Sequence, residues 1–329
     1  MKQRLQTFVS EIHIPEDGLL HFRGQPIQAS ATPEADDLTQ MTEFVYKYLY
    51  THPSGVIKDA FRATAPDARL IEDLKKANTT RCDIQQGWIV RTPLTDGSVV
   101  AERAGIVRKF MPGQFLAEKD TLPIHAGSQL TVTHLAGSMN MQPGFFHMFG
   151  QEQSDMAEQQ RMIRVYFNLL APGTAASAAH LLTRALNTYK IPFIYKTATR
   201  LTDFSRSDTA VLYLSQRFFR IFHLILTHIL KPLRPVLATD IPMFTRSLGP
   251  GIGFAEDPDG EISFGAARSK IVAQAILSSR CSTGTYVERF WSDFCQICDA
   301  RSLDLDALHL NAGSTDTLYF PPASPEIAA

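Results

Sequence analysis

The sequence has few cysteines. Four are spread over 329 residues, too few for a disulfide framework in a chain of this length, so a reducing compartment is expected. Cys295 and Cys298 form a C-x-x-C pair within Tyr286–Ala300, a segment that predicts a helix. Because no second cysteine or histidine pair lies nearby and no strand precedes the motif, zinc binding and thioredoxin chemistry are disfavoured. Two cysteines that pack on one helix are the simpler interpretation.

Long apolar segments are also missing. Met1–Ser10 lacks the apolar core of a signal peptide. The most hydrophobic stretch, Val211–Leu230, is interrupted by two arginines, two histidines and a glutamine, which a membrane-spanning helix would not tolerate. We therefore expect no signal peptide, no membrane partner and a cytoplasmic location.

An excess of one charge is absent as well. The formal net charge is -1, so the chain as a whole carries no signature of nucleic-acid binding. Within residues 184–234, however, nine lysines and arginines stand against two acidic residues. A basic block inside a neutral chain indicates a local anion site rather than a nucleic-acid partner.

The motifs of several common active sites do not occur. The loop Gly249–Gly253 lacks the Gly-Lys-Ser/Thr ending of a P-loop, and the chain has no Gly-x-Ser-x-Gly. His134 and His147 lie apart from other metal-ligating residues and are interpreted as structural. A kinase or ATPase is therefore disfavoured, and neither a metal nor a cofactor is expected.

The hydrophobic periodicity predicts an α+β fold. Helices are expected near 37–50 and 66–76, followed by short strands and hairpins over 84–135. From Arg161 strands and helices alternate, which predicts a mixed sheet with flanking helices. The chain is divided accordingly into a helical and hairpin part (1–140), a core (141–300) and a tail (301–329) that frays after Asp304, with one compact unit as the alternative.

The strand predicted over Ile163–Leu169 has an unusual polar face. Its apolar residues alternate with Arg164, Tyr166 and Asn168, three side chains that form oriented hydrogen bonds to anions. The alternative is an ordinary solvent-facing side of an amphipathic strand. The two explanations have equal weight at this stage.

Lys196 lies in the middle of a second predicted strand. A lysine that is desolvated among arginines is pushed towards its neutral form and can serve as a general base. The alternative is an edge-strand lysine whose ammonium group reaches solvent, and periodicity alone favours that explanation.

Two further segments contain arginines suited to anion binding. In Arg206–Tyr213 a loop arginine, separated from Asp208 by one residue, leads into a strand tyrosine; the arginine forks phosphate oxygens, or it forms an ion pair with Asp208. Ser263 precedes a predicted helix with Arg268 in its first turn, where free N–H groups favour an anion. A carboxylate partner such as Glu256 or Asp257 is the alternative for Arg268.

These segments resemble the HopA-type effector family. The resemblance rests on Arg164–Leu169, Ile191–Lys196, Ser205–Tyr213, Ile241–Pro258 and Ser263–Arg268, with Pro143–Gly150 upstream. Order and spacing agree over about residues 105–280, whereas the first hundred residues match only loosely. Family members occur as plant-pathogen effectors and as bacterial enzymes of class V lanthipeptide and thioamitide biosynthesis, and their fold is similar to that of phosphothreonine lyases.

The resemblance implies a metal-independent lyase that converts phosphoserine or phosphothreonine of a precursor peptide to dehydroalanine or dehydrobutyrine. A separate kinase-like protein would phosphorylate that peptide in the bacterial cytoplasm. The hypothesis assigns the residues of the chain as follows: Lys196 as the base, Tyr213 or Tyr166 as the acid, Arg206, Arg268, Arg164 and Arg246 as the phosphate clamp, and Asn168, Asp208 and Ser263 as supporting residues.

One departure from the lyase pattern leaves an alternative open. Phosphothreonine lyases carry a Lys-x-His pair on their first core strand, and if that strand corresponds to Ile163–Leu169, Arg164 and Tyr166 stand in its place. A non-catalytic effector or scaffold, secreted into a host and binding a protein through the same basic patch, is therefore the competing hypothesis. A lyase that works only in complex with its kinase is a second alternative.

Overall fold

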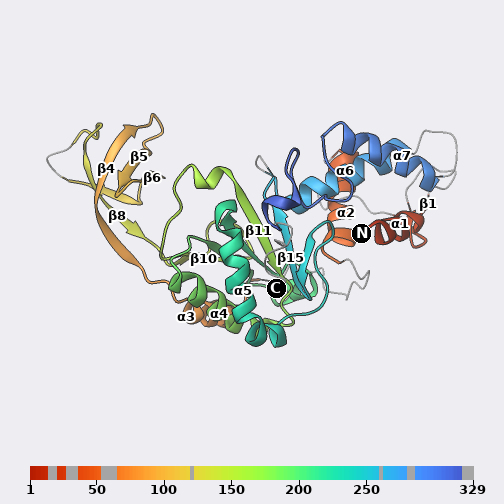
Figure 1. Ribbon diagram of the computed structural model, residues 1–329, viewed down its shortest axis with the longest axis horizontal. Helices are drawn as coiled ribbons and strands as arrows, with labels where there is room; N and C mark the ends of the chain where they lie inside the picture. Colours follow the sequence, from red (N-terminus) through yellow and green to blue (C-terminus); the bar gives the residue numbers. More distant parts are fainter. Residues whose placement is uncertain are drawn as a thin grey trace, which may run out of the picture.

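The computed structural model describes residues 1–13, 21–26, 36–52, 65–118, 122–258, 262–279 and 286–320. It confirms the predicted α+β class. A central sheet lies between two groups of helices, and a second sheet built from hairpins stands to one side of it (Figure 1).

The central sheet has seven strands in the order β14-β15-β11-β13-β12-β10-β9. All of its paired strands are antiparallel, so it is not the mixed sheet that the sequence predicted. The reason is that β13 lies between β11 and β12, which run in the same direction without touching as neighbours. The strands are β9 (Gly137–Ser138), β10 (Phe145–Phe149), β11 (Met162–Phe167), β12 (Ile194–Ala198), β13 (Ala210–Ser215), β14 (Arg246–Gly249) and β15 (Ile252–Glu256).

One face of this sheet is covered by α3 (Ala68–Ala77), α4 (Ala175–Thr188) and α5 (Phe219–Leu233) (Figure 1). Alternate residues of β11 point to this side and are buried without exposure: Ile163, Val165 and Phe167. The apolar set that the period-two pattern predicted is therefore the set that packs on these helices.

The opposite face of the sheet is covered only in part, by helices from both ends of the chain. These are α1 (Lys2–Ser10), α2 (Asp37–Val45), the π-helix η1 (Tyr46–Tyr50), α6 (Phe264–Ser278) and α7 (Tyr286–Asp299). They share one apolar cluster with Tyr166, Val211 and Ala255 of the sheet. The helices α1, α2 and η1 thus pack with helices that follow residue 263, while the division of the chain at residue 140 remains a prediction.

The predicted hairpins form a five-stranded antiparallel sheet in the order β6-β5-β4-β8-β7. Its apolar cluster, which includes Trp88, Phe110 and Leu130, is separate from those of the core. The strands are β4 (Asp83–Pro93), β5 (Val99–Arg103), β6 (Ile106–Phe110), β7 (Phe115–Ala117) and β8 (Gln129–His134). A small sheet near the N-terminus contains β1 (Ile12–His13), β2 (His21–Phe22) and β3 (Gln25–Pro26).

Short 3₁₀ turns connect several of these elements. They are η3 (Glu158–Gln160), η4 (Pro172–Thr174), η5 (Leu201–Ser205), η6 (Gln216–Phe218), η7 (Arg234–Val236) and η9 (Asp316–Leu318).

Two sequence predictions about the C-terminal third are wrong. The glycine-rich segment after Leu248 is the turn of the β14–β15 hairpin rather than an irregular loop. There Gly251 has a φ of +73°, and a Cβ on it would collide with the carbonyl oxygen of Ala238. The tail does not fray after Asp304, because Leu308, Leu310 and Tyr319 are buried in the core; residues 321–329 lie outside the described residues.

The C-x-x-C pair lies on α7, as predicted. Cys298 is buried, and burial raises the pKa of its thiol to about 11. A thiol with a raised pKa is a poor nucleophile and metal ligand, which agrees with a packing role.

Candidate functional site

A cavity of about 240 Å³ lies on the partly covered face of the central sheet. Its lining brings together six residues singled out in the sequence: Arg164, Tyr166, Lys196, Arg206, Asp208 and Ser263. They come from β11, β12, the segment before β13 and the start of α6. Since a water molecule occupies about 30 Å³ in the liquid, the cavity has room for a phosphate group and the side chain that carries it.

Arg206 forms a bidentate ion pair at one wall of this cavity. Its Nε donates to Oδ1 of Asp208 at 2.8 Å and its Nη2 to Oδ2 at 2.9 Å. The hydroxyl of Tyr46 accepts from Nη2 and donates to Oδ2 of Asp208, both at 3.1 Å. Burial alone would raise the pKa of Asp208, but the charge of Arg206 outweighs it and the pKa is lowered. Asp208 is therefore an ionised carboxylate that orients the arginine.

Arg164 supplies a second guanidinium group. Its Nε donates to Oδ1 of Asp257 at 2.7 Å, and its Cζ lies 5.0 Å from the centre of the Tyr213 ring. Both Arg164 and Arg206 bind their carboxylates through Nε and Nη2. Within the described residues, Nη1 of each makes no hydrogen bond, so each retains donors for a ligand.

Lys196 lies at the base of the cavity without an ion pair to any described residue. The side chain is buried, with 9% of the residue exposed, and its Nζ donates to the amide oxygen of Gln142 at 2.8 Å. The nitrogen also lies 4.8 Å and 5.4 Å from the ring centres of Phe145 and Tyr213. Because β12 is paired on both sides, Lys196 is not the solvent-reaching edge lysine that periodicity favoured.

The tyrosines of the cavity are deeply buried. Tyr166 is 2% exposed, and its hydroxyl has no hydrogen-bond partner of acceptable geometry among the described residues. Burial raises the pKa of both Tyr166 and Tyr50. Both phenols are therefore protonated near neutral pH and able to donate a proton or a hydrogen bond.

The structure does not bring the other predicted residues into the cavity lining. Arg268 donates to the backbone oxygens of Leu308 and Leu310, each at 2.7 Å. Arg246 pairs with Asp316, and the side-chain amide of Asn168 donates to the backbone oxygen of Asp240 at 2.8 Å. Tyr213 lies beside the cavity, with its ring between Arg164 and Lys196.

Ser263 lines the cavity and also caps α6. Its Oγ accepts from the backbone N–H of Ala266 at 3.3 Å, which satisfies one of the free donors at the helix start. The predicted anion site at this helix N-terminus therefore already contains one internal acceptor.

Sequence analysis missed four residues at or near this site. Tyr46 and Tyr50 come from η1, which the chain fixes to the core through the bond from the Ser207 N–H to the Thr51 oxygen. Gln142 holds Lys196. None of these positions follows a motif, and only the three-dimensional fold brings them here.

His147, which the sequence analysis interpreted as structural, is the fourth of these residues. It pairs directly with Lys196 across β10 and β12, so the two side chains share one face of the sheet. Burial, with a smaller contribution from Lys196, lowers the pKa of His147 to about 4, and its Nδ1 lacks a partner within the described residues. A single histidine on an apolar strand carried no signal that distinguished it from a structural one.

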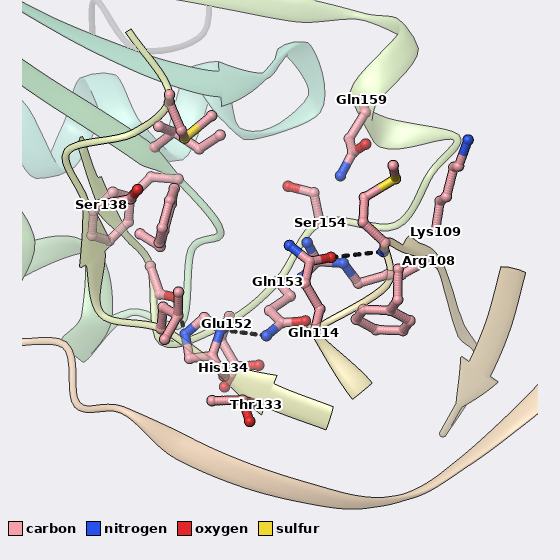
Figure 2. Close-up of a pocket in the computed structure, with 18 of the residues that line it drawn as sticks. Arg108, Lys109, Gln114, Thr133, His134, Ser138, Glu152, Gln153, Ser154 and Gln159 are labelled. Carbon is pink, nitrogen blue, oxygen red and sulfur yellow. Dashed lines mark hydrogen bonds between the residues drawn. The ribbon is translucent and has the colours of Figure 1, made fainter. Parts of the chain in front are cut away.

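A second, larger cavity of about 540 Å³ lies between the hairpin sheet and the same face of the core sheet. Figure 2 shows Arg108 and Gln153 on one side of it and Ser138 on the other. Its titratable lining residues are Arg108, Lys109, His134 and Glu152. It lacks the convergent cations of the smaller cavity, which we therefore take as the candidate active site.

Gly265, in the first turn of α6, allows the rings of Tyr46 and Tyr50 to pack closely against the helix beside the smaller cavity. A Cβ at this position would lie 2.6 Å from Cζ of Tyr50 and 2.7 Å from Cε2 of Tyr46. We expect Gly265→Ala to displace both rings and to lower the free energy of unfolding by about 1–3 kcal/mol, as measured by urea denaturation. Gly173→Ala is the control, since its Cβ meets nothing within 4 Å; equal stability of the two variants would contradict the packing argument.

Within the described residues, no helix has the length and apolar character needed to cross a membrane. In the same part of the chain, no group of His, Cys, Asp and Glu side chains could hold a metal ion.

A family comparison agrees with the resemblance seen in the sequence. A model of the HopA1 effector protein family matches residues 136–310, more than half of the chain. None of the curated proteins compared matches it. An effector protein from Pseudomonas syringae pv. syringae strain 61 shares 17% identity at a TM-score of 0.45, over 84% of this chain and 96% of its own. An effector protein from Pseudomonas syringae pv. tomato strain DC3000 shares 14% identity at a TM-score of 0.45, over 94% of this chain and 100% of its own.

Proposed function

The chain belongs to the HopA1 effector protein family, and we propose that its smaller cavity binds a phosphorylated serine or threonine of a peptide and eliminates the phosphate. The observation that carries this proposal is the convergence of Arg164, Lys196 and Arg206 on one buried cavity. Asp208 is the one carboxylate among its lining residues. Among the described lining residues, three cationic side chains against one carboxylate favour an anionic ligand.

The two arginines are the proposed phosphate ligands. Each is oriented by a carboxylate, Asp257 for Arg164 and Asp208 for Arg206, and each keeps its Nη1 available. Charge-assisted hydrogen bonds to phosphate from preorganised donors are short and strong. Arg268 and Arg246 have no part in this clamp, because they bind other parts of the chain.

Lys196 is the proposed general base. Once it has given up its own proton, the Lys196 amine would take the Cα proton, the electrons of that C–H bond would form the Cα=Cβ double bond, and the Cβ–O bond would break with departure of phosphate. The negative charge that develops on the peptide carbonyl and on the leaving oxygen is stabilised by the nearby guanidinium groups. No external oxidant, reductant or water is consumed.

The leaving phosphate takes its proton from a neighbouring acid. Tyr166, with its buried protonated hydroxyl, and Tyr213, in contact with Lys196, are the two candidates from the sequence. His147 is a third candidate, because a bound phosphate dianion would favour its imidazolium form. Single substitutions at the three positions, with kcat as the readout, separate them.

The activity itself is tested with a phosphothreonine peptide incubated with the purified protein in the presence of a metal chelator. We expect release of inorganic phosphate and a peptide lighter by one phosphoric acid. In the proposed setting the substrate is a precursor peptide phosphorylated by a kinase-like protein in a bacterial cytoplasm, so a parallel sample contains that kinase. Intact phosphopeptide in every sample, kinase included, would rule the lyase out.

A non-catalytic effector that binds a host protein is the second candidate function. It is favoured by one observation, namely that Arg164 and Arg206 are already paired with carboxylates. A binding patch of this kind would retain phosphopeptide affinity in the assay above without producing any dehydrated peptide.

A further inference from the structure

The two cavities are neighbouring compartments on one sheet face. Phe145 lines the smaller cavity and Phe149 the larger one, four residues along β10. On β12, Lys196 lines the smaller cavity and Ile194, two residues away, lines the larger one. Strand geometry of about 3.3 Å per residue puts these paired positions about 7–13 Å apart. An extended peptide has the same rise, so a residue two to four positions from one held at Lys196 reaches the larger cavity.

The larger cavity contains a cation that has no carboxylate partner among the described residues. Arg108 lines it from β6, and no described residue forms an ion pair with it. Burial lowers the pKa of its guanidinium, with no opposing contribution from a carboxylate. Glu152 lines the same cavity but lies beyond ion-pair distance, and Lys109 next to Arg108 is paired with Asp96 at 3.3 Å.

His134, the titratable side chain beside Arg108, does not neutralise the charge of the arginine. Burial lowers the pKa of His134, and the charge of Arg108 lowers it further, which keeps this histidine neutral. The His134 ring forms a hydrogen bond with the Gln153 side chain (Figure 2). It forms another with the backbone oxygen of Gly150, so both ring nitrogens already have partners other than Arg108. An anionic side chain from outside would supply the missing partner.

The remaining walls combine uncharged polar side chains with a group of apolar ones. Phe110, Met111, Met141 and Phe193 contribute to the lining, and Met111 and Met141 are themselves exposed. Methionine side chains adapt to irregular partners. Met141 lines the larger cavity, and the next residue, Gln142, lines the smaller one. The two cavities are therefore adjacent.

We propose that the larger cavity is the subsite for an acidic residue of the substrate peptide, two to four positions from the phosphorylated residue, with Arg108 as its charge partner. The proposal rests on the proposed function and specifies its substrate as an acidic phosphopeptide. The aliphatic part of the glutamate or aspartate side chain, and its neighbours, would lie against the apolar walls.

The test uses two sets of fluorescent phosphothreonine peptides. One set carries a glutamate, and the other a lysine, at one position two to four residues before or after the phosphothreonine. Binding is measured by anisotropy and turnover by phosphate release. For the best glutamate peptide, we expect Arg108→Glu to raise Kd and KM on the order of tenfold while kcat stays unchanged. The matching lysine peptide should recover affinity with Arg108→Glu.

Arg103→Glu is the matched control, because Arg103 lies on the same hairpin sheet, stacks over Trp88 and does not line the cavity. Arg108→Gln serves as a milder second variant, with circular dichroism to establish that each variant is folded. Arg103→Glu should leave both constants unchanged.

The outcomes separate this proposal from the lyase. Turnover with equal KM for glutamate and lysine peptides, in the wild type and in Arg108→Glu, would overturn the subsite and leave the lyase intact. Arg108-dependent binding with no phosphate release from any peptide, also in the presence of the kinase, would support the subsite and overturn the lyase. Loss of affinity in Arg108→Glu without recovery by the lysine peptide would also overturn the subsite.

Discussion

Replacing Lys196 by alanine is expected to lower the rate of phosphate release by about 10³-fold, within the range by which a positioned general base accelerates a reaction. Lys196 is buried without an ion pair to a described residue, and its nitrogen is fixed by Gln142 beside the two arginines of the cavity. The measurement is kcat for the wild type and the variant on one phosphothreonine peptide.

Two further variants separate proton abstraction from phosphate binding. Lys196→Arg places a guanidinium group there that stays protonated and cannot accept the Cα proton, so it should bind the phosphopeptide and release almost no phosphate. Lys231→Ala removes an exposed lysine of α5 and should match the wild type. Wild-type kcat in Lys196→Ala would show that another group is the base.

The second large effect concerns stability. Replacing Asp208 by alanine is expected to lower the free energy of unfolding by about 3 kcal/mol, because it leaves the largely buried Arg206 charge without its carboxylate. Asp208 itself is 5% exposed and accepts from both Arg206 and Tyr46. The measurement is the urea midpoint at neutral pH, converted with the slope of the unfolding transition.

The pH dependence of this effect follows from the lowered pKa of Asp208. Its ordinary pKa is 3.8, and burial acting alone would raise it, but Arg206 holds it lower in the folded state. The carboxylate therefore contributes its full stabilisation above about pH 4 and loses it as the pH falls through the folded-state pKa. The difference between wild type and variant should stay constant from pH 6 to 8, on the same grounds.

Asp306→Ala is the control for this stability measurement. Asp306 forms an exposed ion pair with Lys2 at 2.9 Å, and exposed pairs of this kind contribute little to stability because water and salt screen them. Equal midpoints for the Asp208 and Asp306 variants would contradict the importance assigned to the buried pair.

The period-two pattern was sufficient to predict one strand of the site. Alternation in β11 separated the residues that pack on α4 and α5 from Arg164 and Tyr166, and the structure places the latter in the cavity. The same pattern misjudged Lys196, because periodicity gives the face of a strand but not its place in the sheet. Pairing of β12 with both β10 and β13 is a long-range property.

Arginine partners were the least predictable feature. Arg206 and Asp208 are two residues apart, and their pairing was one of the two explanations considered. Arg268 instead binds backbone oxygens 40 and 42 residues further along the chain. No local signal marks a backbone carbonyl as the partner of a distant arginine. The sequence alone therefore could not exclude the phosphate-binding role predicted for Arg268.

The contribution of η1 to the cavity has a consequence for how the protein can be shortened. The region that matches the family begins at residue 136, yet Tyr46 and Tyr50 form part of the cavity wall and Tyr46 braces the Arg206–Asp208 pair. A fragment trimmed to the family boundaries would retain Lys196 and both arginines but expose them to bulk water, where charges attract one another more weakly. The segment that matches the family is therefore smaller than the unit that encloses the proposed chemistry.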